Sequence, residues 1–422
     1  MRIALLSPLP PERTGIADYA AHWREALAAS GVAVDAPLDQ RAAFGSLHEA
    51  RAWVHAQDWR GVDVVHAELG GGRQREYLAL RALQAWRRAQ PAGAAVPALS
   101  ATVHDPERLV WRPMHALGLA LERSPAPRAL RQAAALATDA WALRDERRVA
   151  QGLDGCVTLT RTGGNALARR LHLPPELISV IPHGTLDVAP ASLPALPPQG
   201  PLRLVYFGFI YAGKGIEDLL DALALLVQRQ PGWVTRLRLT LAGGTAPDIA
   251  FGSRGSYLQT LRERVHALGL STLVDWALDV DEADVPALLQ AHHAVVLPYR
   301  ESRKLAWLGQ MRGTSGALAW AIACGRGAIT SDARAFAEEI ASGNGAAFPQ
   351  GDVPALARRI EMLLEQPRQL RDWAERAGEL AAQRRWPQTA RRFRAHFDAV
   401  RARAAAGRPA GVLAGRPVET PR

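Results

Sequence analysis

The chain has 422 residues but only two lysines, two cysteines and no long uninterrupted apolar stretch. A helix that crosses a bilayer needs about 20 mostly apolar residues, so the sequence predicts no membrane span. The apolar start at residues 3–6 is too short for the core of a signal peptide and predicts a first buried strand instead. Cys156 and Cys324 lie in apolar surroundings, which favours free core thiols in a reducing compartment over a disulfide.

Several motifs that would point to other enzyme classes are also missing. The first strand-to-helix turn is not G-x-G-x-x-G, so a nicotinamide site is not indicated, and neither G-x-S-x-G nor G-x-x-x-x-G-K-[ST] occurs. His292 and His293 have no carboxylate or cysteine partner at helical spacing, which argues against zinc. We therefore predict neither a metal nor a cofactor.

Positive charge is abundant but concentrated at the carboxyl end. Of the net charge of +10, the stretch from Arg384 onward supplies +8, with ten arginines against Asp398 and Glu419. This distribution does not predict a nucleic-acid partner. One hypothesis is a cytoplasmic protein whose basic tail contacts anionic lipid headgroups at the inner face of the membrane. The alternative is a solvated tail in a chain that prefers arginine to lysine.

The rest of the chain alternates short apolar runs with helical patterns, which predicts βαβ units and parallel sheets. In the first half, strands are expected at 3–7, 62–66, 101–104, 157–160 and 178–181, with a helix at 17–30. In the second half, strands are expected at 202–207, 237–242, 274–277, 294–298 and 327–331, and helices at 215–228, 257–268, 285–291, 315–323, 333–342 and 353–365.

This alternation predicts an α/β protein with two Rossmann-like, doubly wound domains that face each other across a cleft. The expected parts are a first Rossmann-like domain at 1–188, a Pro-rich linker at 189–201, a second Rossmann-like domain at 202–385, a helix at 386–405 and a basic, disordered tail at 406–422. Loops that follow parallel strands gather at one sheet edge, where ligands of such folds bind.

The segment Gly313–Leu318 is the first candidate site, because it follows an apolar strand and opens an apolar helix. Thr314 or Ser315 can cap this helix, which would leave the amides of Gly316 and Ala317 free to bind a phosphate with help from the helix dipole. The plainer alternative is an ordinary helix cap.

The second candidate is the glycine-containing loop from Phe207 to Gly215, which includes Gly208 and Lys214. A diphosphate leaving group needs positive charge as its bond to the sugar breaks, and a lysine supplies that charge without a metal. The alternative is a surface lysine beside a turn, but the scarcity of lysine in this chain favours a function for Lys214.

The first domain offers residues for the facing wall of the cleft. Gly15 would let backbone approach a ligand, and Arg13 would meet a phosphate or an acidic acceptor. Gly71 and Gly72 form a loop that either touches the acceptor or is a simple turn. His104, at the end of a predicted strand, is a candidate for contact with a sugar hydroxyl, with a packing role as the alternative.

Together these segments resemble the GT-B glycosyltransferases, in the group related to family 4, over about residues 1–400. The segments that carry the resemblance are 15–19, 180–184, 206–217, 314–325 and 329–331, together with His104 and Trp386. The resemblance implies that Lys214 and the helix at 315–323 hold the donor diphosphate, that His104 lies near the reacting sugar, and that the helix from Trp386 crosses back to the first domain. It also implies that residues 1–188 form an acceptor-side domain, that residues 202–385 form a nucleotide-sugar-binding domain, and that the reaction is retaining and metal-independent.

Three positions depart from the pattern of this group. Phe209 stands where an arginine is usual, and Arg312 and Trp320 stand where two glutamates are usual. Arg312 could contact phosphate in place of the missing arginine. The expected activity is transfer of a hexose from a UDP- or GDP-sugar to a carbohydrate or lipid-linked acceptor, in glycan or polysaccharide biosynthesis. Two alternatives stay open: a non-catalytic homologue that binds sugar or nucleotide, and a nucleotide-sugar epimerase.

Overall fold

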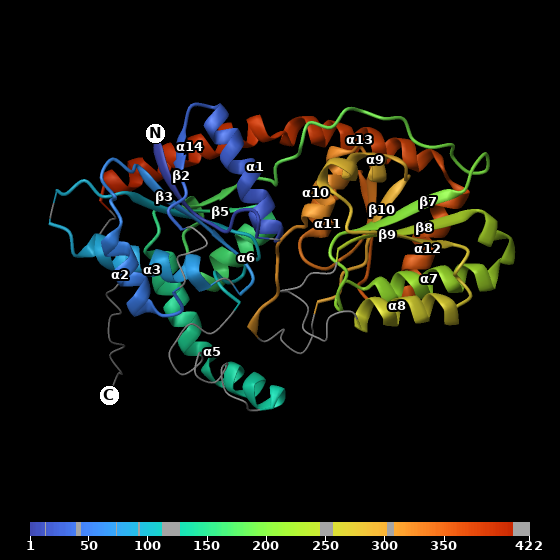
Figure 1. The fold of residues 1–422 in the computed structure, drawn as a ribbon, viewed down its shortest axis with the longest axis horizontal. Helices are drawn as coiled ribbons and strands as arrows, with labels where there is room; N and C mark the ends of the chain where they lie inside the picture. The colour runs from blue at the N-terminus through green and yellow to red at the C-terminus, as the bar shows by residue number, and fades with distance from the viewer. Residues whose placement is uncertain are drawn as a thin grey trace, which may run out of the picture.

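The computed structural model describes residues 1–12, 14–38, 44–72, 74–91, 93–111, 127–244, 256–301 and 308–407. Two layered α/β domains lie end to end, and the last helix runs back along the first domain (Figure 1). Each domain contains one six-stranded sheet in which all pairs are parallel. Within these ranges no helix is both long enough and apolar enough to cross a bilayer.

The first sheet has the order β2-β1-β3-β4-β5-β6. Its strands are β1 (Arg2–Leu6), β2 (Ala33–Asp35), β3 (Val64–Leu69), β4 (Ala98–Val103), β5 (Gly155–Thr158) and β6 (Ile178–Val180). Its helices are α1 (Gly15–Ala29), α2 (Leu47–Ala56), α3 (Gln74–Arg88), α5 (Arg128–Gln151) and α6 (Arg161–Leu171), with a 3-10 turn at Pro175–Leu177. The central strands β3 and β4 are buried throughout, as expected for a sheet covered on both faces.

The second sheet has the order β12-β11-β10-β7-β8-β9. Its strands are β7 (Leu202–Phe207), β8 (Leu237–Gly243), β9 (Val274–Leu278), β10 (Ala294–Leu297), β11 (Gly327–Ser331) and β12 (Gly345–Phe348). Its helices are α7 (Ile216–Arg229), α8 (Ser256–Ala267), α9 (Val285–Gln290), α10 (Gly316–Ala323), α11 (Phe336–Glu339), α12 (Val353–Glu365) and α13 (Arg368–Arg384), with 3-10 turns at Pro231–Thr235 and Glu282–Asp284.

The predicted helix at 333–342 is wrong in its extent. The structure has only the short helix α11 there, because Arg334 takes a left-handed conformation with φ 57° that ends any regular helix. Strands β2 and β12 were not predicted, since three or four residues are too few to show a period. Cys156 and Cys324 are buried free thiols, as expected.

Helix α14 (Trp386–Ala405) packs on the first domain although it follows the second in sequence. With α1 it covers one face of the first sheet, while α2 and α3 cover the other (Figure 1). The side chains of Phe393, Phe397 and Val400 are fully buried in the same cluster as Ile3 and Leu5. The core of the first domain therefore contains both ends of the described chain.

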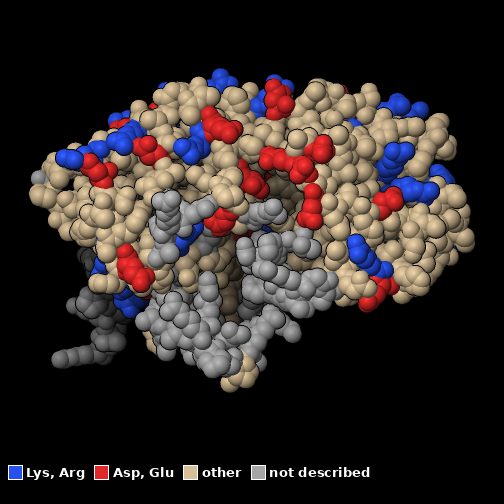
Figure 2. Space-filling view, in the orientation of Figure 1, with Lys and Arg blue, Asp and Glu red and all other residues tan. Residues whose placement is uncertain are grey.

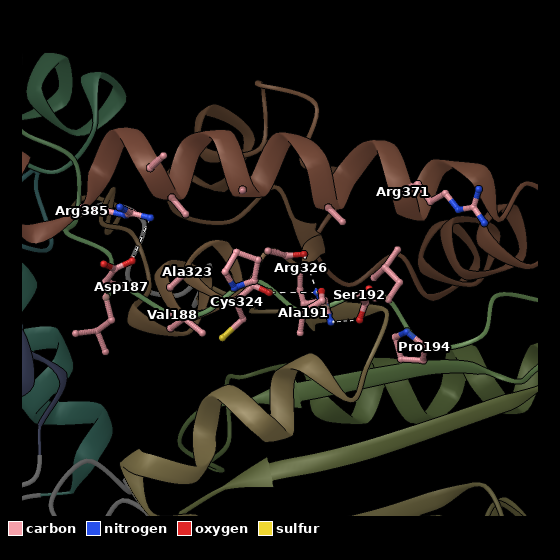
Figure 3. A pocket seen from close by; sticks show the side chains of 18 of the residues that line it. Asp187, Val188, Ala191, Ser192, Pro194, Ala323, Cys324, Arg326, Arg371 and Arg385 are labelled. Carbon is pink, nitrogen blue, oxygen red and sulfur yellow. Dashed lines mark hydrogen bonds and ion pairs between the residues drawn. The ribbon is translucent and has the colours of Figure 1, made fainter.

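The segment that joins the domains packs against the second one. Arg326 donates to the carbonyl oxygens of Ala191 and Ser192 at 3.2 and 3.0 Å, and a cavity of about 610 Å³ lies between this segment and α13 (Figure 3). Cys324 and Arg385 line this cavity, but none of the predicted site residues does. The candidate site is therefore built elsewhere, where the two domains touch.

Candidate functional site

The amino-terminal tip of α10 forms the centre of the candidate site. Ser315 occupies the N-cap position, but its hydroxyl pairs with the Tyr299 hydroxyl at 3.1 Å, and Thr314 donates to Glu339 at 2.9 Å. Ser315 is therefore the N-cap residue, as predicted, but neither hydroxyl forms a capping hydrogen bond, because both are engaged elsewhere. Among the described residues, no acceptor bonds the N–H groups of Gly316 and Ala317, so the tip keeps two donors for an anion.

The loop between β7 and α7 lies against this tip. Gly208 has φ 130°, and a Cβ placed there would lie 3.7 Å from both Ala317 Cβ and the Tyr299 hydroxyl. At Gly215, with φ 68°, a Cβ would lie only 1.8 Å from the Pro298 carbonyl oxygen. Because these positions accept only glycine, the loop is drawn close to β10 and carries Lys214 to the tip of α10.

Lys214 is a cation that has no acidic partner. Its Nζ lies 3.6 Å from the centre of the Tyr299 ring and 5.1 Å from that of Tyr211, and it forms no ion pair with any described carboxylate. Burial lowers the pKa of Lys214 from 10.5 to about 8. The Tyr299 hydroxyl in turn contacts Ser315, so the ammonium group and the helix tip share one tyrosine. A buried cation without a counter-charge is a binding position for an anionic ligand.

Arg334 is a second cation at this place, and the sequence did not single it out. Its guanidinium donates to Asp105 of the first domain at 3.1 Å and to the Thr314 carbonyl oxygen at 3.3 Å, and lies 5.8 Å from the centre of the Tyr299 ring. Its backbone N–H donates to Glu301 at 3.1 Å. A non-glycine residue in the left-handed region costs energy, and such strain concentrates at functional sites.

Arg312 and Trp320 stand where two glutamates are usual, and their side chains contact other parts of the protein. The Arg312 guanidinium lies 3.6 Å from Glu107 of the first domain and also contacts Gln310. Trp320 packs against the core of the second domain. Since the Arg312 side chain is already paired across the domain boundary, its contact with phosphate stays a prediction.

The first domain brings several predicted residues to the same boundary. His104 Nε2 donates to Glu68 Oε2 at 2.7 Å. A Cβ at Gly70 would lie 3.0 Å from His104 Cβ and 2.7 Å from Ile16 Cδ1. The Gly71 N–H donates to Asp105 at 3.0 Å.

The loop around Gly71 and Gly72, the start of α1 and His104 therefore form one wall of the site. Gly15 is exposed at the start of α1, where Thr14 caps the helix by accepting from Ala17 at 3.1 Å. Arg13 lies outside the described residues.

Three other histidines are structural. His183 donates from Nδ1 to the Gly184 carbonyl oxygen at 2.7 Å and packs edge-on against Tyr19, and its burial lowers its pKa to about 4. His292 bonds Thr240 and the Leu288 carbonyl oxygen, while His293 accepts from the Arg203 N–H at 2.9 Å. In the described ranges, no cluster of His, Cys, Asp and Glu could hold a metal ion.

The two domains are in direct contact around the site. A Cβ at Gly313 would lie 2.1 Å from the His104 carbonyl oxygen, and the Arg312 N–H donates to the Pro106 carbonyl oxygen at 2.6 Å. Glu338 accepts from the N–H groups of Arg161 and Thr162, at 2.8 and 2.6 Å.

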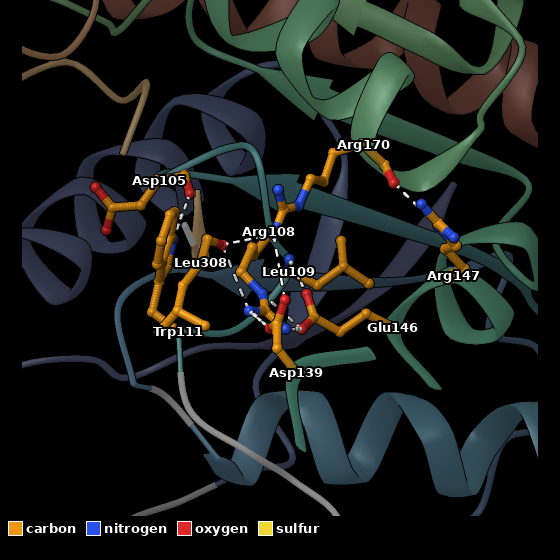
Figure 4. A network of polar contacts seen from close by, with 9 residues as sticks. All are labelled: Asp105, Arg108, Leu109, Trp111, Asp139, Glu146, Arg147, Arg170 and Leu308. Carbon is orange, nitrogen blue, oxygen red and sulfur yellow. Dashed lines mark hydrogen bonds and ion pairs between the residues drawn. The ribbon is translucent and has the colours of Figure 1, made fainter. Parts of the chain in front are cut away.

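A buried ionic network of the first domain also reaches across. Arg108 is bound by Asp139 and Glu146, and Arg108 and Arg170 donate to the Leu308 carbonyl oxygen at 3.5 and 2.8 Å (Figure 4). The structure therefore shows the domains closed on each other, with Lys214, Arg334 and His104 at the contact.

On the face in Figure 2, acidic side chains gather around the hollow between the domains, and basic side chains are scattered without a continuous stripe. The cations of the site are therefore local and internal, which suits a small anionic ligand better than an extended polyanion.

Two parallel Rossmann-like domains with facing loops, and a last helix that returns to the first domain, define the GT-B architecture. Residues 194–380 match the family described as Glycosyl transferases group 1. This match lies within the second domain and the linker before it, and it confirms the resemblance to group 1 glycosyltransferases that was inferred from the sequence. Family 4 is compatible with this match.

Known proteins agree with this assignment. The chain is 28% identical over 197 residues to D-inositol 3-phosphate glycosyltransferase 2 of Catenulispora acidiphila, a match that spans 46% of this chain and 42% of that relative. Sucrose-phosphate synthase of Thermosynechococcus elongatus has the same fold, with TM-score 0.67, 20% identity and coverage of 96% of this chain and 100% of that one. Anabaena HepE, solved with UDP-glucose, gives TM-score 0.64, 17% identity and coverage of 94% and 99%.

Two signals in the sequence could have found the residues that were missed. His66 and Glu68 are polar residues two positions apart in an apolar strand, so both point to the same buried face. Arg334 follows the strand β11 at the same sheet edge as Lys214. Its left-handed backbone, by contrast, has no sequence signature, because that conformation normally selects glycine or asparagine.

Proposed function

We propose that the protein transfers a hexose from a UDP- or GDP-sugar to a carbohydrate or lipid-linked acceptor, with retention of configuration and without a metal ion. The observation that carries the proposal is the unpaired Lys214 ammonium group beside the open amides at the tip of α10. A diphosphate fits this place because it brings the negative charge that the lysine lacks in the closed protein.

Each side chain then has a defined task. Lys214 and the amides of Gly316 and Ala317 hold the diphosphate, and Arg334 lies within the same tyrosine-centred cluster. His104, on the opposite wall, lines the side of the sugar. The contacts between the domains exclude water, which limits hydrolysis of the donor. The complex of HepE with UDP-glucose supports a nucleotide sugar as the donor.

One observation keeps a second candidate, a non-catalytic nucleotide-binding homologue. Arg312 and Trp320 replace two carboxylates, and the structure engages Arg312 with Glu107 and Trp320 with the core. The sequence motifs of the cleft contain no convincing carboxylate pair for the proton removal that an epimerase requires. The expected cytoplasmic location, with a membrane contact through residues 406–422, stays a prediction, and residues 408–422 lie outside the described chain.

A panel of UDP-, GDP- and ADP-sugars, followed by thermal shift and then by release of the nucleoside diphosphate, tests the proposal. We expect one nucleotide sugar at 100 times its Kd to stabilise the protein by about 2.7 kcal/mol. Release of the diphosphate should rise when the correct acceptor is added. Binding without release in the presence of any acceptor would support the non-catalytic homologue, and interconversion of two sugar epimers would support an epimerase.

The pH dependence of nucleotide binding should follow Lys214. Its pKa of about 8 means that the ammonium group, which attracts diphosphate, becomes a neutral amine above that pH. The charged groups that face it are Asp105 and Arg334, together with the phenols of Tyr211 and Tyr299.

We therefore expect the affinity for UDP to be level between about pH 7 and 8 and to fall by up to about tenfold per pH unit above 8. Calorimetric titration measures this, and Lys214→Arg should abolish the fall. A level wild-type profile up to about pH 9.5 would contradict it.

A further inference from the structure

A continuous chain of polar side chains runs from the cleft through the core of the first domain. His104 Nε2 lies 2.7 Å from Glu68 Oε2, and Glu68 Oε1 lies 3.3 Å from His66 Nε2. Beyond them, His66 contacts the hydroxyl of Ser100 at 3.1 Å, and Ser100 contacts His396 of α14 at 2.8 Å. Of these residues, His104 is the one at the contact with the second domain.

Glu68 is the anchor of this chain. It is fully buried on the central strand β3, where a carboxylate is costly unless it is satisfied. Burial alone would raise its pKa, but the hydrogen bond from His104 and the nearby ring of His66 outweigh burial and lower it to about 2. Glu68 is therefore a carboxylate at neutral pH, and a carboxylate can only accept hydrogen bonds.

Because Glu68 can only accept a hydrogen bond, it determines which nitrogen of His104 carries the proton. The nitrogen that faces Glu68, Nε2, must be the donor, so in the neutral ring Nδ1 is the acceptor. In the described part of the chain, no hydrogen bond to His104 Nδ1 is formed. The His104 side chain retains 11% exposure, whereas Glu68 behind it has none, so the ring is accessible from the cleft and not from the core.

We propose that Glu68 is a positioning residue that fixes His104 with its proton on Nε2, so that Nδ1 accepts a hydrogen bond from a hydroxyl group of the sugar bound in the cleft. The inference rests on the proposed function for the identity of the ligand. The tautomer itself follows from Glu68 alone.

Nitrogen NMR of protein labelled in its histidines tests the tautomer directly, with His104→Gln to assign the signals. Where the wild-type His104 ring is neutral, we expect its proton to be on Nε2. Its Nδ1 signal should shift when UDP-glucose saturates the protein and stay in place with UDP. A neutral ring with its proton on Nδ1 would overturn the role of Glu68. Protons on both nitrogens, or an Nδ1 signal that saturating UDP-glucose leaves unchanged, would overturn the acceptor role of Nδ1.

Glu68→Gln is the matched variant, because an amide of the same shape can donate as well as accept. We expect it to populate the Nδ1–H form and to lower kcat/KM for the sugar donor by about tenfold, with the affinity for UDP changed less than twofold. Thr102→Val is the control, since Thr102 bonds His66 at 2.9 Å and not His104.

Thr102→Val should alter the Tm without altering the tautomer of His104.

Equal losses of UDP and sugar-donor affinity in Glu68→Gln would indicate a merely structural role and reject the proposal. If no nucleotide sugar saturates the protein, the proposed function fails, and with it the sugar contact of Nδ1. The tautomers of the wild type and of Glu68→Gln still decide whether Glu68 fixes the ring.

Discussion

Replacing Lys214 with alanine is expected to lower kcat/KM for the nucleotide sugar by about 100- to 1,000-fold. The loss follows because Lys214, beside the tip of α10, forms no ion pair with a described carboxylate and so keeps its charge for the ligand. A preorganised group that stabilises developing charge contributes on this scale. Steady-state release of the nucleoside diphosphate, with and without acceptor, measures the effect.

The fold should survive this change, because Lys214 forms no ion pair with a described carboxylate and the nearby Asp105 keeps its ion pair with Arg334. Lys214→Arg keeps the charge over the Tyr299 ring and should retain part of the activity. Arg229→Ala, at the exposed end of helix α7, which follows the loop that carries Lys214, is the matched control and should leave turnover unchanged. If Lys214→Ala transferred sugar at the wild-type rate, the assignment of the site would be rejected.

Arg334→Gly is expected to lower the affinity for the sugar donor and to leave the stability of the protein nearly unchanged. It removes the second cation of the site, so we expect donor affinity to fall by about 10- to 100-fold, the range for a charge-assisted hydrogen bond. Glycine adopts φ near +57° without strain, which offsets the lost ion pair with Asp105. The Tm should therefore move by less than about 4 °C.

The complementary variant, Arg334→Lys, keeps the positive charge and the strained backbone. It should recover donor affinity in part while it gains no stability. His172→Gly is a control for the backbone alone, because His172 also has positive φ, at the end of α6 and not in the cluster around Tyr299. Loss of donor affinity in His172→Gly equal to that in Arg334→Gly would show that the effect is not local.

The periodicity of the sequence was sufficient for the architecture. Strands β7 and β11 occur at the predicted residues, because buried parallel strands are uninterrupted apolar runs bounded by polar turns. Where the prediction of helices and strands from periodicity was wrong, the conformation of a single residue was the cause. Arg334 shortened a predicted helix through a left-handed backbone that tertiary contacts with Asp105 and Thr314 hold in place.

The position of the site could be predicted from the sequence, but the contacts between its residues could not. Gly208, Lys214, Ser315 and Ala317 were predicted from their places after strands, and the structure brings them together around Tyr299. The partnerships that define their chemistry could not be predicted. They join residues of different domains or strands, as Arg312 does with Glu107, and no local spacing encodes them.

Helix α14 changes the usual order in which the domains of a nascent chain fold. Domains generally fold as units in the order of their synthesis. Here Phe393, Phe397 and Val400 complete the core around Ile3 and Leu5. The core of the first domain is therefore complete only after the second domain has been synthesised. A message truncated before Trp386 would therefore yield a polypeptide whose oldest part, and not its newest, is left with bare apolar surface.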